Sequence, residues 1–211
     1  MAKREVTEKT GEINVCGQLL RHAQRTHRGA YWLGTSTRAE ARLAYDAALA
    51  AGAFAVAFLQ FKAANRRRGK IAFQINGQQF LTLAGRSRRY PHSTFYALPA
   101  FRLQKQLMTA APGFLRWTCF VDVESMTAFP ATGANFHVLL DPALAEDTTQ
   151  PAFRRIVLDG QPHVSAPCVG WSGLVQSLSD IGGSFDRDQP QEVSIFEPLR
   201  GVRQPAMLVL P

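Results

Sequence analysis

Several absences narrow what this chain of 211 residues can be. It has only three cysteines and no CxxC pair, which argues against a disulfide framework or a zinc site and predicts reduced, mostly buried thiols. Its longest apolar runs are about half the roughly 20 residues that a membrane-spanning helix needs, so we expect no membrane segment. The polar start MAKREVTEKTGE lacks the apolar core of a secretory signal, and we expect a cytoplasmic protein. No glycine-rich phosphate loop, dinucleotide fingerprint or serine-hydrolase elbow is present.

Acidic residues are scarce in the first half of the chain. Residues 1–105 hold 18 lysines and arginines against 5 acids, a net charge of +13, whereas residues 106–211 hold 6 against 11, a net charge of −5. Positive charge concentrated in one half predicts a polyanionic partner, with nucleic acid the first choice. A basic surface that only confers solubility, or one that docks an acidic protein, is the alternative.

Segments with helical and strand-like patterns alternate, which indicates an α/β or α+β fold. The expected strands besides 50–63 are 71–75, 93–98, 117–123, 136–140 and 156–158. The expected helices begin near Arg38, where Thr37 and Glu40 fit a capping box, and at Gln78, and cover 101–108 and 171–181. Residues 13–20 fit a short strand or the start of a helix, residues 64–70 a basic loop, and Asn76-Gly77 a turn. We expect an N-terminal extension (1–30), one domain (31–185) and an extended tail packed on the body (186–211).

The segment 50–63, AAGAFAVAFLQFKA, predicts a buried strand with a polar end. Alternate residues of a strand share a face, so Gln60 and Lys62 point the same way, and both faces before them are apolar. A covered strand that ends in an amide and an ammonium needs partners for both groups. The simpler interpretation is that the strand emerges into solvent there.

The preceding acids have two interpretations. On helix propensity, RAEARLAYDAALAA runs helical to Gly52, which would leave Asp46 as an exposed helical aspartate. Alternatively, residues 43–49 turn extended and pair with the 50–63 strand. Glu40 can act as a helix cap, as a catalytic acid, or as both. Asp46 and Glu40 are the only acids in residues 13–121, and carboxylate and amide oxygens are ligands for hard divalent cations.

In this order, Glu40, Asp46, Gln60 and Lys62 resemble the PD-(D/E)XK nuclease superfamily in its variant with glutamine at the third position. The segments EARLAYDAAL, FLQFKA and STFYALPAF are also similar to a group of prokaryotic proteins that share L-G-Y-D and L-Q-F-K patterns. The resemblance covers about residues 31–141 and implies a restriction-endonuclease-like mixed central sheet flanked by helices. It also implies that Asp46 and Gln60 bind Mg²⁺ or Mn²⁺, that Lys62 is the catalytic lysine, and that Glu40 positions water or a second ion. Tyr45 stands where the family has proline, and Ala44 where it has glycine.

Two basic clusters suit phosphate contacts, which add affinity without sequence specificity. Their residues are Arg66, Arg67, Arg68, Lys70, Arg86, Arg88 and Arg89. From the resemblance we expect a metal-dependent nuclease, with DNA the first choice of substrate and RNA the alternative. By analogy with the use of such folds, we expect it to be an effector subunit of a prokaryotic defence or mobile-element system, controlled by a protein partner or by homo-oligomerisation. The alternative is an inactive nuclease-fold protein that binds nucleic acid or acts as a scaffold.

Overall fold

The computed structural model describes residues 5–26, 29–35, 40, 42–51, 55–110, 113–142, 153–169 and 174. Its helices are α1 (Glu8–Thr26), α3 (Gly77–Arg89) and α4 (Gln104–Ala110), with two short 3₁₀ turns, η1 (Phe114–Trp117) and η2 (Val123–Met126). The expected cap at Thr37, the helix 171–181 (apart from Leu174) and the tail 186–211 lie outside the described residues. Of the two interpretations of residues 13–20, the helix is right, because they lie within α1.

The first sheet is mixed, and it contains the strand with the polar end. Its order is β1 (Tyr31–Gly34), β2 (Ala47–Ala51), β3 (Ala55–Phe61), β6 (Thr94–Pro99) and β7 (Thr118–Asp122). All neighbours are antiparallel except β3 and β6, which run parallel. The mixed sheet flanked by helices is therefore confirmed. The chain is extended from Ala47 onward, so Asp46 does not lie on a continuous helix.

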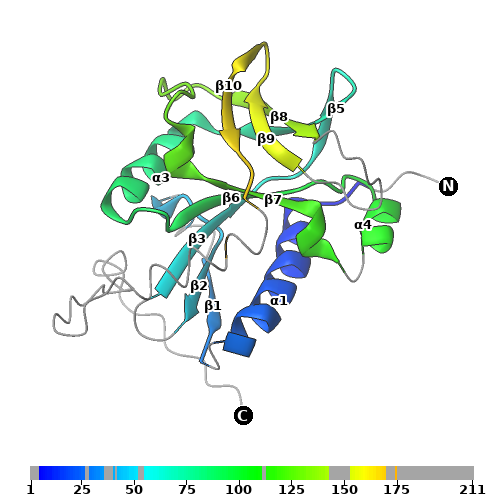
Figure 1. Ribbon diagram of the computed structural model, residues 1–211, viewed down its shortest axis with the longest axis vertical. Helices are drawn as coiled ribbons and strands as arrows, with labels where there is room; N and C mark the ends of the chain where they lie inside the picture. Colours follow the sequence, from blue (N-terminus) through cyan, green and yellow to red (C-terminus); the bar gives the residue numbers. More distant parts are fainter. Residues whose placement is uncertain are drawn as a thin grey trace.

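A second sheet, which we did not predict as a separate layer, packs over one side of the first (Figure 1). Its order is β10 (Gln161–Pro167), β9 (Phe153–Leu158), β8 (Phe136–Pro142), β5 (Lys70–Ile75) and β4 (Asn65–Arg67), all antiparallel. The expectation of a basic loop at 64–70 is wrong, because β4 and β5 form a hairpin there. Arg68 and Gly69 make its two-residue turn, with φ of 49° and 78°, as a tight hairpin turn requires.

The Asn76-Gly77 pair does not form a turn between strands. The Asn76 side chain instead accepts a hydrogen bond from the amide of Gln79 at 2.9 Å and caps α3. A turn and a helix N-cap both favour asparagine, because its short side chain binds nearby backbone amides. The Asn-Gly pattern alone therefore does not separate a turn from a cap.

Two hydrophobic cores lie on opposite faces of the first sheet. On one face, α1 places Val15, Leu19 and Ala23 against strand residues such as Leu59 and Phe61. The spacing of four residues puts the three α1 side chains on one stripe of the helix. The segment expected to be an extension thus contributes directly to the packing of the body.

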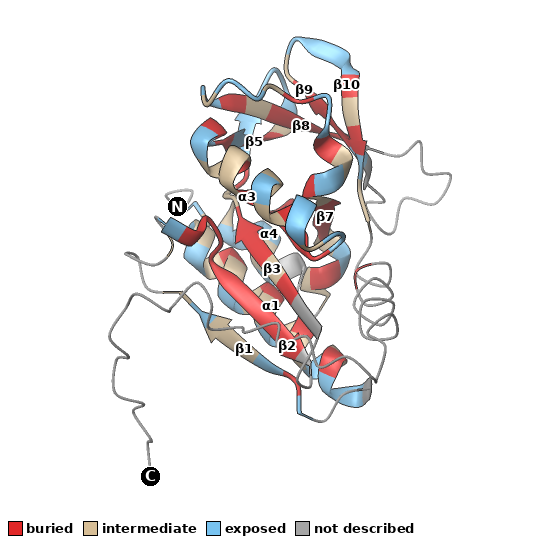
Figure 2. Ribbon diagram, turned by 90° about the vertical axis from the view of Figure 1, so that its left-hand side faces the viewer, coloured by how far each residue is buried: buried red, intermediate tan, exposed pale blue. Residues whose placement is uncertain are grey.

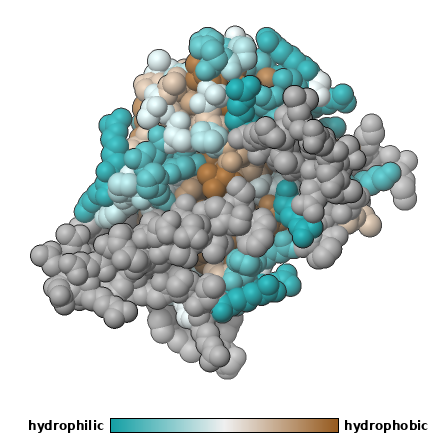
Figure 3. Space-filling model, in the orientation of Figure 1, coloured by the Kyte–Doolittle hydropathy of each residue, from teal (hydrophilic) through white to brown (hydrophobic). Residues whose placement is uncertain are grey.

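The other core lies between the two sheets and includes α3. It contains Ala48 and Tyr96 from the first sheet, Phe73 and Val138 from the second, and Leu83 from α3. Strands β2 and β3 are therefore covered on both sides, as predicted for the apolar run that forms β3, and their residues of described exposure are buried except for the half-buried Phe58 (Figure 2). In Figure 3 the described surface is mostly hydrophilic, with a small apolar area near the centre of the view.

A disulfide joins Cys119 of β7 to Cys168, just after β10, and so links the two sheets. The expectation that all three cysteines are reduced is wrong for this pair, since 49 residues separate the two cysteines in sequence and spacing did not reveal their contact. Next to the bridge, Phe120 and Val169 exchange two backbone hydrogen bonds of 2.7 and 3.2 Å. Cys16 on α1 is a free thiol, and burial raises its pKa.

No helix in the part of the chain that the structure describes is both long and apolar enough to cross a membrane.

Candidate functional site

Asp46 and Gln60 meet at the point where β2 begins and β3 ends. The Asp46 amide donates to the Leu59 carbonyl at 2.9 Å, which sets the register. The Asp46 carboxylate then accepts two hydrogen bonds at the same oxygen, Oδ2: 2.7 Å from Gln60 Nε2 and 2.6 Å from the Phe61 amide. Residues 46 and 60 are therefore in contact, but through the Gln60 nitrogen, whereas the expectation was that their two oxygens converge on a cation. The contact depends on antiparallel pairing of β2 with β3, which places residue 46 opposite residue 60.

The amide oxygen of Gln60 is buried and has no hydrogen-bond partner among the described residues. Gln60 is fully buried, and its amide nitrogen is already bound to Asp46 and to the Phe61 carbonyl. A buried acceptor without a donor costs roughly 1–3 kcal/mol, so such atoms are uncommon unless something else binds them. If the Gln60 amide turned its oxygen toward Asp46, the two side chains would offer the oxygen ligands that a hard divalent cation such as Mg²⁺ or Mn²⁺ prefers.

Asp46 holds its proton unusually well. Its pKa is raised from 3.8 to about 7, chiefly by burial; the hydrogen bond from the Phe61 amide opposes the rise, and the neighbouring carboxyls of Glu40 and Glu8 add to it. An acid in this environment is destabilised when ionised unless positive charge is supplied. A bound cation would supply that charge.

Glu40 reaches this site from the turn before β2. Its carbonyl accepts a 2.7 Å hydrogen bond from the amide of Ala44, where the helical segment ends. Ala44 then takes a positive φ of 64°, a conformation that favours glycine. Ala44 adopts this left-handed turn at some cost in strain.

Lys62 lies just beyond β3, on the face that Gln60 uses. Its side chain is mostly buried, and its ammonium lies 3.9 Å from the Glu8 carboxylate on the first turn of α1. Glu8 also accepts a 3.3 Å hydrogen bond from the Ala63 amide. Burial raises the pKa of Glu8, Glu40 raises it further, and Lys62 opposes the rise.

Glu8 is the site residue that sequence reasoning missed. It lies 54 positions before Lys62, in the segment assigned to an extension. The available signal was the apolar spacing of Val15, Leu19 and Ala23, which identifies α1 as an amphipathic helix that must pack on the body. An acid in the first turn of such a helix can face the end of the sheet.

The three carboxylates do not form a closed metal cage. Among the described residues, only His92, Asp122 and Glu124 bring three acidic or imidazole ligand atoms within 4.8 Å of one another. His92 Nδ1 lies 2.7 Å from Asp122 Oδ2, and this contact raises the pKa of the imidazole. His92 and Glu124 are exposed and Asp122 is half-buried at the far end of β7, and the cluster is explained as a surface ion pair.

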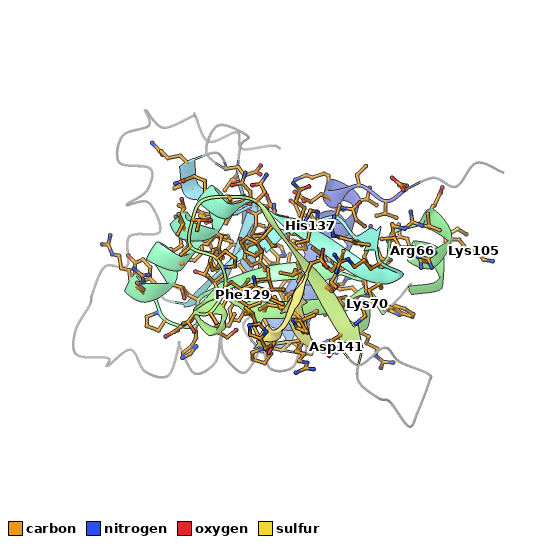
Figure 4. The ribbon with its side chains drawn as sticks, turned by 90° about the horizontal axis from the view of Figure 1, so that it is seen from above. Arg66, Lys70, Lys105, Phe129, His137 and Asp141 are labelled. Carbon is orange, nitrogen blue, oxygen red and sulfur yellow. A yellow bond between two sulfur atoms is a disulfide. The ribbon has the colours of Figure 1, made fainter. Side chains whose placement is uncertain are left out.

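The first basic cluster lies on the β4–β5 hairpin, which follows Lys62 by three residues. Arg66, Arg67, Arg68 and Lys70 are all exposed. Arg67 and Arg68 pair with Asp159 at the β9–β10 turn. Figure 4 shows Arg66 and Lys70 extending from the hairpin, with Lys105 of α4 toward the same side in that view.

The second basic cluster lies at the end of α3, and its members are not equivalent. Arg88 and Arg89 are exposed, whereas Arg86 is half-buried. The Arg86 guanidinium lies 4.7 and 4.6 Å from the ring centroids of Tyr45 and Phe58 and donates to the Leu43 carbonyl at 3.2 Å. These contacts favour a structural role for Arg86, in which it fixes the segment that leads into Asp46.

Comparison with protein-family models, with curated proteins and with solved structures found no match to this chain.

Proposed function

We propose that this protein is a metal-dependent nuclease whose site is built on Asp46, Gln60 and Lys62. The observation that carries the proposal is the Asp46–Gln60 pair. A buried carboxylate with a pKa of about 7 lies beside a buried amide group whose oxygen lacks a partner. Both features are costly in the free protein, and one divalent cation would relieve both once the amide turns its oxygen toward Asp46.

In this proposal Asp46 and Gln60 hold Mg²⁺ or Mn²⁺. The ion would supply charge stabilisation for the phosphate and would help to activate water. Lys62, whose ammonium lies 3.9 Å from the Glu8 carboxylate, would supply the positive charge that steadies the phosphate to be cleaved. The Glu8 and Glu40 carboxylates face the site and orient or deprotonate the attacking water.

The exposed hairpin residues Arg66 and Lys70 support a polyanionic substrate, because they follow the site directly in the chain. DNA is the first choice of substrate. We further propose control by a partner protein or by self-association, as for an effector of a prokaryotic defence or mobile-element system; this step rests on analogy.

The test is cleavage of plasmid and single-stranded DNA with Mn²⁺ or Mg²⁺ by the wild type and by Lys62→Ala and Asp46→Ala. Lys105→Ala is the control, since it removes an exposed lysine that belongs to α4 and not to the proposed metal site. We expect cleavage by the wild type and the control, and a loss of at least 100-fold in both site variants. Equal cleavage by all four proteins would point to a contaminating nuclease and refute the proposal.

A second candidate function is nucleic-acid binding without cleavage. It is favoured by the hydrogen bond from Gln60 Nε2 to Asp46, because the amide must turn before its oxygen can join Asp46 on a cation. Salt-sensitive DNA binding with no cleavage, and no effect of Asp46→Ala on that binding, would support this candidate.

A further inference from the structure

A pocket of about 260 Å³ opens beside the acidic site. Glu8 and Lys62 border it on the site side. Four side-chain amides complete its polar lining: Asn65, Gln74, Asn76 and Asn135. They come from β4, β5, the start of α3 and the loop before β8, segments that only the tertiary structure brings together.

Two of these amides are held in place by the first turn of α3. The Asn76 oxygen accepts from the Gln79 amide at 2.9 Å, and the Asn135 oxygen accepts from the Gly77 amide at 3.3 Å. Their amide nitrogens have no hydrogen-bond partner within the described part of the chain and stay available as donors. The backbone before Asn135 lies very close to the start of α3, since a Cβ on Gly77 would lie 2.2 Å from the Ala134 carbonyl oxygen.

The other two amides, Asn65 and Gln74, are exposed strand residues whose side chains make no hydrogen bond to another described residue. Each can donate and accept at once. The pocket lining therefore carries one carboxylate, one ammonium and four neutral amides, which offer both hydrogen-bond donors and acceptors. Such a lining does not select a phosphate, which prefers arginine and lysine. It matches the edge of a nucleobase, where donors and acceptors alternate and where asparagine and glutamine are the usual partners of adenine.

The pocket is smaller than the roughly 300–1,000 Å³ of sites for drug-sized ligands, a size that suits one base and not a base pair. A base enters a pocket of this size only after it has left the helical stack, so the base must be unpaired. Lys62 belongs both to the pocket and to the acidic site, which places the base next to the phosphate that Lys62 contacts.

We infer that this amide-lined pocket binds the base of an unpaired nucleotide adjacent to the cleaved phosphate, so that the substrate is single-stranded or frayed nucleic acid. The inference rests on the proposed function for the position of the phosphate. Binding of the base itself depends only on the pocket.

The experiment measures the affinity of the protein for labelled oligodeoxynucleotides of 12 nucleotides, both single-stranded and as a duplex. All measurements use one salt concentration and contain EDTA, so that the DNA is not cleaved. The test variant is the double substitution Asn65→Ala with Gln74→Ala, two exposed residues whose removal leaves the helix cap intact. The control is Gln161→Ala, which removes an exposed glutamine from β10, at the opposite edge of the second sheet.

We expect the wild type to bind single strands at least tenfold more tightly than duplex. The double variant should bind single strands about tenfold more weakly, equivalent to about 1.4 kcal/mol, with unchanged duplex binding. Gln161→Ala should match the wild type. Equal affinity for single strand and duplex, unchanged single-strand binding by the double variant, or no binding at all would overturn the inference. If base-dependent binding is found but no metal-dependent cleavage, the nuclease proposal fails and the pocket stands.

Discussion

Replacing Asp46 by asparagine should make the metal-free protein more stable at neutral pH. The substitution removes the charge but keeps the shape, and the introduced amide oxygen can still accept from the Phe61 amide. Gln60 can turn its own oxygen toward the new amide nitrogen, which satisfies the atom that lacks a partner in the wild type.

The magnitude follows from the pKa of Asp46. The folded protein raises it from 3.8 to about 7, and a shift of that size corresponds to about 4 kcal/mol. Because the folded state binds this proton more tightly than the unfolded chain, the contribution of the protonated Asp46 to the free energy of unfolding is fully present below pH 4. It is lost as the pH rises toward 7. The asparagine variant does not titrate, so its advantage grows over the same window.

The assay is urea unfolding in EDTA at pH 4, 5, 6, 7 and 8. At pH 8, Asp46→Asn should raise the free energy of unfolding by as much as about 4 kcal/mol, and at pH 4 the two proteins should agree within about 1 kcal/mol. The control is Asp141→Asn, which breaks an exposed ion pair with Arg155 of 2.9 Å and should cost less than about 1 kcal/mol at every pH. An Asp46→Asn variant that is less stable than the wild type at pH 8 would show that Asp46 is not a destabilised buried acid.

Three further substitutions test the surrounding structure. Cys168→Ser removes the disulfide that spans 49 residues and should lower the free energy of unfolding by about 4 kcal/mol. The wild type in dithiothreitol should have the same stability as this variant, and equal stability of oxidised and reduced wild type would contradict the disulfide. Gly77→Ala would place a methyl group 2.2 Å from the Ala134 oxygen and should cost about 3 kcal/mol, measured by urea unfolding, so an unchanged midpoint would refute the close packing at this turn. Arg86→Ala removes the guanidinium from two aromatic rings and a carbonyl and should lower stability by about 2 kcal/mol, whereas Arg88→Ala on the same helix should change it by less than about 0.5 kcal/mol; equal thermal shifts would show that Arg86 is not structural.

Several features of the fold followed from local patterns. The apolar run before Gln60 required a strand covered on both faces, and β3 has a core on each side. The strands expected at 93–98 and 117–123 are β6 and β7, and the helix expected from Gln78 is α3. Side-chain periodicity and apolar content depend on neighbours within a few residues, so these elements could be predicted from the sequence alone.

Long-range contacts were beyond such patterns. Residues 64–70 became a hairpin because β5 pairs with β8, more than 60 residues away, and Cys119 met Cys168 because β10 packs near β7. Glu8 entered the site because α1 packs across the first sheet. None of these contacts leaves a signal in nearby sequence, since each depends on how separate elements bury their apolar faces together.

Chain order and residue type already specified that an amide and an ammonium share one face at the end of a covered strand, because strand alternation and burial are local properties; they left open whether Asp46 lies on a helix. Whether Asp46 reaches Gln60 was decided by the pairing of β2 with β3, which brings the Asp46 oxygen within 2.7 Å of the Gln60 nitrogen and 2.6 Å of the Phe61 amide. Three features could not be predicted from the sequence and come from the tertiary structure: the second sheet, the acid that α1 brings to the site, and the pocket whose four amides come from separate elements. Burial then raised the pKa of Asp46, since only a packed interior can withhold water from a carboxylate.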